Sequence, residues 1–184
     1  MATVGRLVLR VLVGALFVGH GTQKLFGWFG GQGPDGTGAT FESAGLRPGK
    51  RNALAAGATE AAGGVLLATG LATPVAASLL SGAMLTATRT VHWERGVWNS
   101  KGGYEYPAVI LAVVFALAES GPGRASLDAA LGQERRGLAW AFAQVGAAAV
   151  ASHAVVELGR RRVGAAEARD ADAPAHQDRL RPAA

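Results

Sequence analysis

The sequence predicts an all-α protein, a transmembrane helical bundle with a four-helix core and a fifth membrane helix towards the C-terminus. Composition is the first reason: 49% of the 184 residues are hydrophobic and only 17% are charged, whereas soluble domains average about 25% charged residues. The distribution of charge is the second reason. The charges are clustered, which leaves long apolar stretches between them, and about 20 apolar residues suffice to cross a bilayer.

Five helices are expected, near residues 5–27, 53–71, 74–92, 104–120 and 137–158. The first contains the uncharged stretch between Arg10 and Lys24. The second and third share the uncharged residues 61–88, which the turn sequence at residues 70–74 divides. The fourth is the shortest, and the fifth is uncharged from residue 137 to residue 156. A soluble bundle is the alternative, but these helices lack the polar outer face that it requires.

The chain is expected to divide into a core domain at residues 1–128, an additional transmembrane helix at 129–158 and a charged tail at 159–184. The Ala/Pro-rich, non-periodic tail predicts disorder. The first helix is not followed by a convincing small-x-small cleavage site, so it is interpreted as a retained anchor. Gly31, Gly33 and Gly36 fit a dinucleotide-binding pattern. Because no strand precedes them and no helix is expected directly behind, they are interpreted as a flexible loop.

The composition excludes several functions. The chain has no cysteine, so it has no disulfide, iron–sulfur cluster or thiol nucleophile. A net charge of +5 would suggest nucleic-acid binding in a soluble protein, but membrane proteins carry such an excess in the loops that flank their helices. No nucleic-acid partner is therefore expected. The Glu-x-x-His pair of di-iron bundles is missing, and neither a metal nor a nucleotide is predicted as a cofactor.

The connectivity places the unusual residues at one end of the bundle. The loop between the first two helices and the loop between the third and fourth must lie on the same side. Aromatic side chains follow these helix ends, and the opposite side retains only the turn at 70–74 and the loop at 121–137. We therefore expect a functional site on the first side. The polar residues that reach it are His20, Lys24, Glu60, Arg89, His92 and Glu105.

Glu60 is the most informative of these residues. It lies roughly 10 Å into its helix at the α-helical rise, and an ionisable side chain at such depth is unfavourable by several kcal/mol unless it is paired. Its candidate partners are Lys24, Arg89 and His92. Each residue also has a structural interpretation: the cations can extend to the membrane interface, the histidines can bond helix ends, and Glu60 can clamp two helices.

The assembled residues resemble the DoxX family of small bacterial membrane proteins, in order from residue 6 to residue 128. The resemblance implies a four-helix membrane core in the bacterial plasma membrane. It points to DoxD, the quinone-linked relative in thiosulfate:quinone oxidoreductase, and to membrane oxidoreductase complexes of oxidative-stress defence. The fifth helix and the tail fall outside it. The matching motifs include Phe17-x-x-His20-Gly21-x-Gln23-Lys24-Leu25-Phe26-Gly27-Trp28-Phe29-Gly30-Gly31, Gly57-x-x-Glu60-x-x-Gly63-Gly64, Gly70-Leu71-x-Thr73-Pro74, Gly96-x-Trp98, Gly102-Gly103-x-Glu105-Tyr106-Pro107 and Ser126-Leu127-Asp128.

The resemblance implies a subunit of a quinone-linked membrane oxidoreductase. Glu60 and His92 would relay protons between the quinone and its surroundings. Lys24 or Arg89 would stabilise the negative charge that develops on the reduced quinone. The aromatic and polar mouth of the quinone site would consist of His20, Trp28, Trp98, Glu105 and Tyr106.

A second function is a non-catalytic anchor that recruits soluble redox enzymes through residues 28–51 and 93–105. A transporter is third, and so small a bundle would have to form a homo-oligomer to act as one. Whether the chain is an enzyme at all stays open between these functions.

The membrane orientation also stays open. Apart from residues at helix ends, Arg6, Arg10, Arg124, Arg135 and Arg136 lie on one side, and Arg47, Lys50, Arg51, Arg95 and Lys101 lie on the other. Cytoplasmic loops carry the excess of Lys and Arg, so this even distribution decides nothing. The cluster of Arg160, Arg161 and Arg162 would decide it, in a direction that depends on whether the fifth helix spans the membrane.

Overall fold

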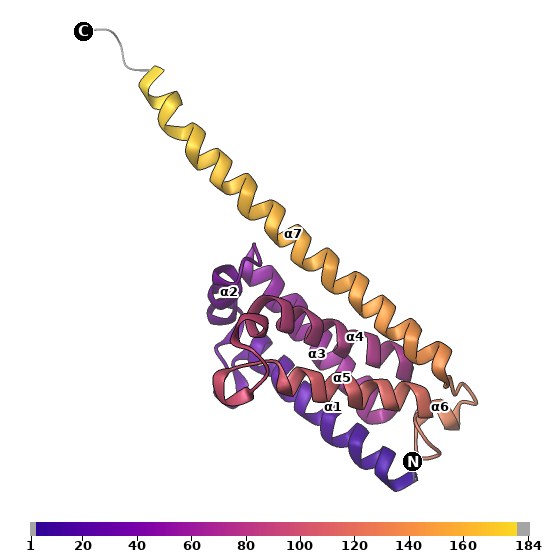
Figure 1. The fold of residues 1–184 in the computed structure, drawn as a ribbon. Coiled ribbons are helices and arrows are strands. Elements are labelled where there is room, and N and C mark those ends of the chain that lie inside the picture. Colours follow the sequence, from indigo (N-terminus) through magenta and orange to yellow (C-terminus); the bar gives the residue numbers. More distant parts are fainter. Residues whose placement is uncertain (1–2, 180–184) are drawn as a thin grey trace.

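The computed structural model describes residues 3–179, which form helices and loops and no strand, so the all-α prediction is confirmed there (Figure 1). A bundle is formed by α1 (Thr3–Phe26), α3 (Gly49–Thr69), α4 (Thr73–Ala87) and α5 (Glu105–Ser120). Figure 1 shows the short helices α2 (Gly33–Ser43) and α6 (Leu127–Ala130) at opposite ends of the bundle. The long helix α7 (Leu138–Arg179) crosses the bundle and extends past its α2 end.

The five predicted helices correspond to α1, α3, α4, α5 and α7. The turn predicted at residues 70–74 is present: Gly70 adopts the left-handed conformation, with φ of 65°, and Leu71 N–H donates to the Leu66 oxygen over 2.9 Å, as in a glycine C-cap. α4 continues as a π-helical turn over Thr88–His92, which reaches the predicted end of the third helix. One three-residue 3₁₀ turn, Trp28–Gly30, follows α1, and two more, Trp93–Arg95 and Asn99–Lys101, lie between the π-helical turn and α5.

Helix α2 corrects the interpretation of residues 31–36 as a flexible loop. An 11-residue helix begins at Gly33. Pro34 lies in its first turn, where a missing N–H is tolerated and the fixed φ suits a helix. Asp35 adds a negative charge near the helix N-terminus. The abundance of glycine concealed these two starting signals. The elements that precede it are the helix α1 and the 3₁₀ turn Trp28–Gly30, not a strand.

Helix α7 departs from the predicted disorder of residues 159–184. It continues without a break to Arg179, and residues 180–184 lie outside the described part of the chain. Alanine and arginine, which are frequent beyond Gly159, have high helix propensity. The Arg161 guanidinium also bonds the Glu157 carboxylate one turn earlier, at 3.2 Å, and such pairs favour a helix. Composition alone suggested disorder because it ignores this local helical preference.

Helices α1 and α3 approach each other through glycines spaced seven residues apart on each helix. A Cβ atom built on Gly14 would lie 2.6 Å from the Gly64 oxygen, and one on Gly21 would lie 2.6 Å from the Gly57 oxygen. No real side chain fits at these distances, so the two backbones are in direct contact at both positions. Small residues permit this close approach between helices in membranes.

We expect Gly14→Ala to lower the free energy of unfolding by about 2 kcal/mol, because the added methyl group must push α3 away. The melting temperature in detergent should then fall by roughly 6 °C. Gly19→Ala is the matched control in the same helix, since nothing lies within 4 Å of a Cβ there. It should leave stability unchanged or raise it by up to about 1 kcal/mol. Equal melting temperatures for the two variants would contradict the close contact.

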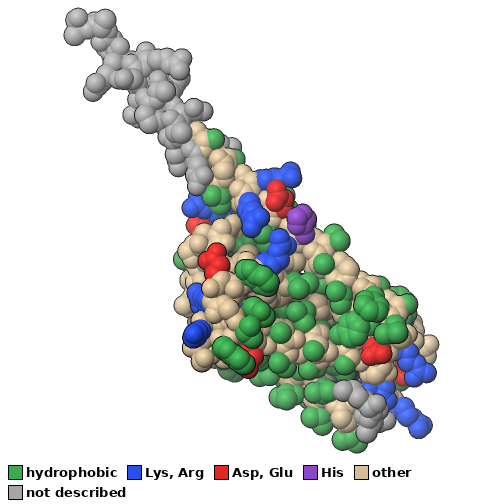
Figure 2. Space-filling view, viewed as in Figure 1, with side chains coloured by type: hydrophobic (Ala, Val, Ile, Leu, Met, Phe, Trp, Pro, Cys, Tyr) green, Lys and Arg blue, Asp and Glu red, His purple; other side chains and the backbone are tan. Residues whose placement is uncertain are grey.

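The outer surface of the bundle is apolar along its middle. Figure 2 shows hydrophobic side chains over the centre of one face and charged side chains towards both ends. The segments Val4–Phe26 and Leu138–Ala165 are long and apolar enough to cross a membrane, with mean hydropathies of 1.5 and 1.4. Helices α4 and α5 have 15 and 16 residues. Spanning by the other three predicted helices therefore stays a prediction.

A buried network closes the α6 end of the bundle. Arg10, only 1% exposed, donates to the Pro122 oxygen at 2.6 Å and to the Ala125 oxygen at 2.7 Å. Asp128, 2% exposed, accepts from the N–H of Ala72 at 2.8 Å and from the N–H of Thr73 at 3.0 Å. These are unpaired donors at the start of α4. Arg10 and Asp128 therefore hold α1, the turn between α3 and α4 and the loop between α5 and α6 together, at the end where the sequence predicted only a turn and a loop.

Candidate functional site

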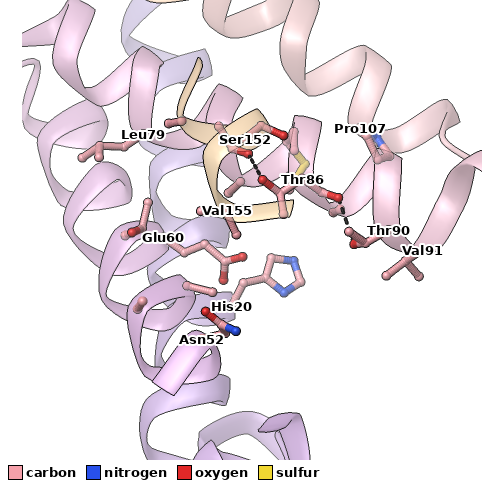
Figure 3. Close-up of a pocket in the computed structure, with 18 of the residues that line it drawn as sticks. His20, Asn52, Glu60, Leu79, Thr86, Thr90, Val91, Pro107, Ser152 and Val155 are labelled. Atoms are coloured by element: carbon pink, nitrogen blue, oxygen red, sulfur yellow. Dashed lines mark hydrogen bonds between the residues drawn. The ribbon is translucent and has the colours of Figure 1, made fainter. Parts of the chain in front are cut away.

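A cavity of about 610 Å³ opens between the helices at the α2 end of the bundle (Figure 3). It lies on the side that the connectivity predicted. Its walls come from the second half of α1, the first half of α3, the second half of α4, the start of α5 and the middle of α7. Small side chains dominate the walls: Ala55 and Ala56 on α3, Ala83 and Ala87 on α4, and Ala147 and Ala151 on α7.

An ion pair lies in the wall of this cavity. The Lys24 ammonium contacts the Glu60 carboxylate at 2.6 Å, and the two side chains are 20% and 8% exposed. Of the three candidate partners, the structure thus pairs Glu60 with Lys24. A cation in this place supplies the partner that a buried carboxylate requires. Gly57 and Gly64, one turn before and one turn after Glu60, are the positions where α3 touches α1. The close contact brings the two charged side chains within reach.

Both predicted histidines line the cavity. Nδ1 of His20 and the Gln23 side-chain oxygen are 3.1 Å apart. Nδ1 of His92 is 2.6 Å from the Gly102 oxygen. A carbonyl oxygen can only accept, so Nδ1 of His92 carries the proton, and Nε2 is the nitrogen that has a lone pair in the neutral ring. The π-helical turn at Thr88–His92 positions His92, and such turns occur often at functional sites.

Other predicted site residues do not reach the cavity. Arg89 is exposed and is not part of its wall. Trp28 and Trp98 are 57% and 64% exposed, so they lie on the surface of this end. Glu105 accepts a hydrogen bond from the Asn99 N–H at 2.9 Å and thereby fixes the loop before α5. Of the residues predicted to form the mouth, His20 and Tyr106 line the cavity.

The sequence interpretation missed Asn52 and Ser152, which also line the cavity. Asn52 lies near the start of α3, one residue before the helix that the sequence predicted at residues 53–71. Ser152 lies in α7, which was predicted as a helix apart from the core. A serine within an uncharged span was the only available signal. Helix α7 therefore supplies a wall of the site rather than an independent anchor.

No group of three His, Cys, Asp or Glu side chains in the described residues is arranged to hold a metal ion. The cofactor prediction stays untested by this finding. The groups that could contact an organic ligand are the Lys24–Glu60 pair, the ring of His92, the amide of Asn52 and the hydroxyl of Ser152.

One family model is similar to part of this chain. The family model for DoxX matches residues 5–93, which include α1 to α4 and the π-helical turn. The match ends before α5, earlier than the range of residues 6–128 over which the motifs are similar. No curated protein and no solved structure gives a match.

Proposed function

We propose that this chain, a membrane protein of the DoxX family by its residues 5–93, binds a lipophilic quinone in the cavity beside Lys24 and Glu60. It would act there as the membrane subunit of a quinone-linked oxidoreductase in the bacterial plasma membrane. One observation carries the proposal: a buried ion pair in the wall of an otherwise largely apolar cavity. The resemblance to DoxD contributes the class of ligand.

The cavity fits such a ligand in size and chemistry. Small-molecule sites measure about 300–1,000 Å³ and combine apolar walls with few polar groups, and this cavity measures about 610 Å³. Alanines on three helices form walls against which a flat ring can pack. The apolar surface of α1 and α7 borders the bilayer in this proposal, so a lipid-soluble ligand can enter from the membrane.

The proposed roles follow from the hydrogen-bonding capacity of each group. Bound quinone would supply the redox chemistry. The Lys24 ammonium can donate to a carbonyl oxygen and stabilise negative charge there. Glu60 and the free Nε2 of His92 can accept protons. Arg89 is exposed, so the charge-stabilising role is assigned to Lys24. The chain has no cysteine, so a partner protein would exchange electrons with the quinone.

We expect Glu60→Gln to reduce bound quinone at least tenfold, because the amide is a much poorer partner for Lys24 and cannot take up a proton. Quinone content per chain is measured by solvent extraction of the detergent-purified protein, and turnover is measured with an artificial electron donor. Glu119→Gln is the matched control, an exposed glutamate at the other end of the bundle. Wild-type protein that is folded but free of quinone and inactive would contradict the proposal.

A second function, an anchor for soluble redox enzymes, is favoured by the exposed aromatic residues at the cavity end. Phe29 is 77% exposed and has a positive φ of 52°, which is unfavourable for a bulky residue. Trp93 is 65% exposed and stacks on Tyr104. An anchor predicts that Phe29→Ser and Trp93→Ser release a co-purifying enzyme, whereas Glu60→Gln retains it. The quinone site predicts that redox turnover is lost in Glu60→Gln and retained in Phe29→Ser and Trp93→Ser.

A further inference from the structure

Several helical hydroxyl groups of this chain share one pattern. Serine and threonine in helices usually donate back to the carbonyl oxygen four residues earlier. Three of the hydroxyl groups in the cavity wall do so: Ser78 donates to the Pro74 oxygen at 2.8 Å, Thr86 to the Gly82 oxygen at 2.8 Å, and Thr90 to the Thr86 oxygen at 2.9 Å. These hydroxyl protons are engaged within α4 and its π-helical turn, so they are not free for a ligand.

Ser152 departs from this pattern. Its residue is 2% exposed, its hydroxyl group has no hydrogen-bond partner among the described residues, and it lines the cavity. It also lies near the middle of the apolar segment Leu138–Ala165, where bulk water does not reach it if α7 spans the membrane. Leaving a buried hydroxyl group unpaired is unfavourable, so an unpaired one at a cavity wall points to a partner in the cavity.

We propose that Ser152 is the second polar contact of the cavity ligand, donating a hydrogen bond to an acceptor oxygen on it. This inference rests on the proposed quinone site and deepens it. Lys24 and Glu60 form the first polar contact, from α1 and α3, and Ser152 forms the second from α7. Figure 3 shows Ser152 apart from the group of Glu60, His20 and Asn52. The ligand therefore carries two separated acceptor oxygens.

A ring with two opposed carbonyl groups, a 1,4-dione, can satisfy both contacts. One carbonyl oxygen accepts from Lys24 and the other accepts from Ser152, while the faces of the ring pack against the alanines of α3, α4 and α7. A ring with one carbonyl group can satisfy only one of the two contacts. Helix α7 thereby becomes a determinant of ligand choice, although it lies outside the residues that match the family.

The test compares two probes on three proteins. The probes are a decyl-substituted 1,4-benzoquinone and a decyl-substituted cyclohexenone, which carries one carbonyl group. The proteins are the wild type, Ser152→Ala and Ser78→Ala, all full-length in detergent. Ser78 is the matched control, because it also lines the cavity but its hydroxyl proton is engaged by the Pro74 oxygen. Affinities are measured by isothermal titration calorimetry, and melting temperatures are measured without ligand.

We expect Ser152→Ala to weaken binding of the dione about tenfold, the effect of one lost hydrogen bond, and to remove the preference for the dione over the cyclohexenone. Its melting temperature without ligand should stay the same or rise, since the variant removes an unpaired buried group. Ser78→Ala should change the affinity less than twofold. A purely structural Ser152 would lower the melting temperature and leave the preference intact, which overturns the inference.

The proposed function can fail separately from the role of Ser152. If the wild type binds the dione and Ser152→Ala binds it equally well, the role of Ser152 is wrong and the quinone site stands. If the wild type binds neither probe, the quinone site is wrong, and so is the proposed hydrogen bond from Ser152 to its ligand.

Discussion

Asp128→Ala is expected to lower the free energy of unfolding by about 3–5 kcal/mol, because it leaves buried donors unpaired at about 1–3 kcal/mol each. The Asp128 carboxylate accepts from the N–H of Ala72, the N–H of Thr73 and the Thr73 hydroxyl group, at 2.8, 3.0 and 2.9 Å. Alanine leaves all three donors without this partner. Ala72 has a positive φ of 47°, so the turn also loses the group that holds it in this strained conformation.

The melting temperature of the detergent-purified protein checks this prediction, with a fall on the order of 10 °C expected. Asp35→Ala is the control. Asp35 also pairs with a cation, Lys50, at 2.7 Å, but the side chains are 78% and 61% exposed. Exposed pairs contribute less than about 1 kcal/mol, so the control should move the melting temperature by no more than roughly 3 °C. A similar shift in both variants would show that the Asp128 network does not hold the α6 end together.

Lys24→Met is expected to destabilise the protein by roughly 3 kcal/mol, since it leaves the Glu60 carboxylate in the cavity wall without its cation. The double variant Lys24→Met/Glu60→Gln should recover a large part of this loss, because no unpaired charge remains. The four proteins of this double-mutant cycle are compared by chemical denaturation in mixed micelles. A coupling free energy of about 1.5 kcal/mol or more is expected for residues in direct contact.

Lys50→Met serves as the control for the loss of a lysine from an exposed pair. It should lower the free energy of unfolding by less than about 1 kcal/mol. A Lys24→Met variant as stable as the wild type would mean that Glu60 does not depend on Lys24. That result would contradict the ion pair between Lys24 and Glu60 and the polar contact with a ligand that is proposed from it.

The end of the bundle that holds the site could be predicted because connectivity decides it. The connection from α1 to α3, which contains α2, and the connection from α4 to α5 place the ends of these four helices on the same side, whatever the packing. Glu60 stood out for a similar reason, since a lone carboxylate in an apolar helix must find a partner. The choice of Lys24 over Arg89 was not predictable from spacing. It follows from the packing, because Lys24 lies on α1, whose glycines contact α3 beside Glu60, whereas Arg89 is exposed.

Packing between distant elements could not be predicted in the same way. Arg10 was counted as a flanking charge, but it is buried because carbonyl groups of the loop after α5 surround it. Ser152 was overlooked because nothing in the sequence of α7 says which of its faces meets α4. Helix α2 was missed because its glycines conceal a proline start. For Arg10 and Ser152, the deciding neighbours lie on elements whose relative placement is set by the angles and lengths of the helices.

The direction of α7 has a consequence for the chemistry of the site. Helix α7 begins at the α6 end, and Gly159 packs against the Gly45 oxygen near the cavity end, where the Arg162 guanidinium donates to the Arg47 oxygen at 3.4 Å. Its three consecutive arginines thus join the cavity end, giving eight cations there against five at the other end when Lys24 and Arg89 are left out. Cytoplasmic loops carry such an excess. For a spanning α7, we therefore expect Glu60 and His92 to exchange their protons with the cytoplasm, so that a quinone reduced at this site would take up protons from inside the cell.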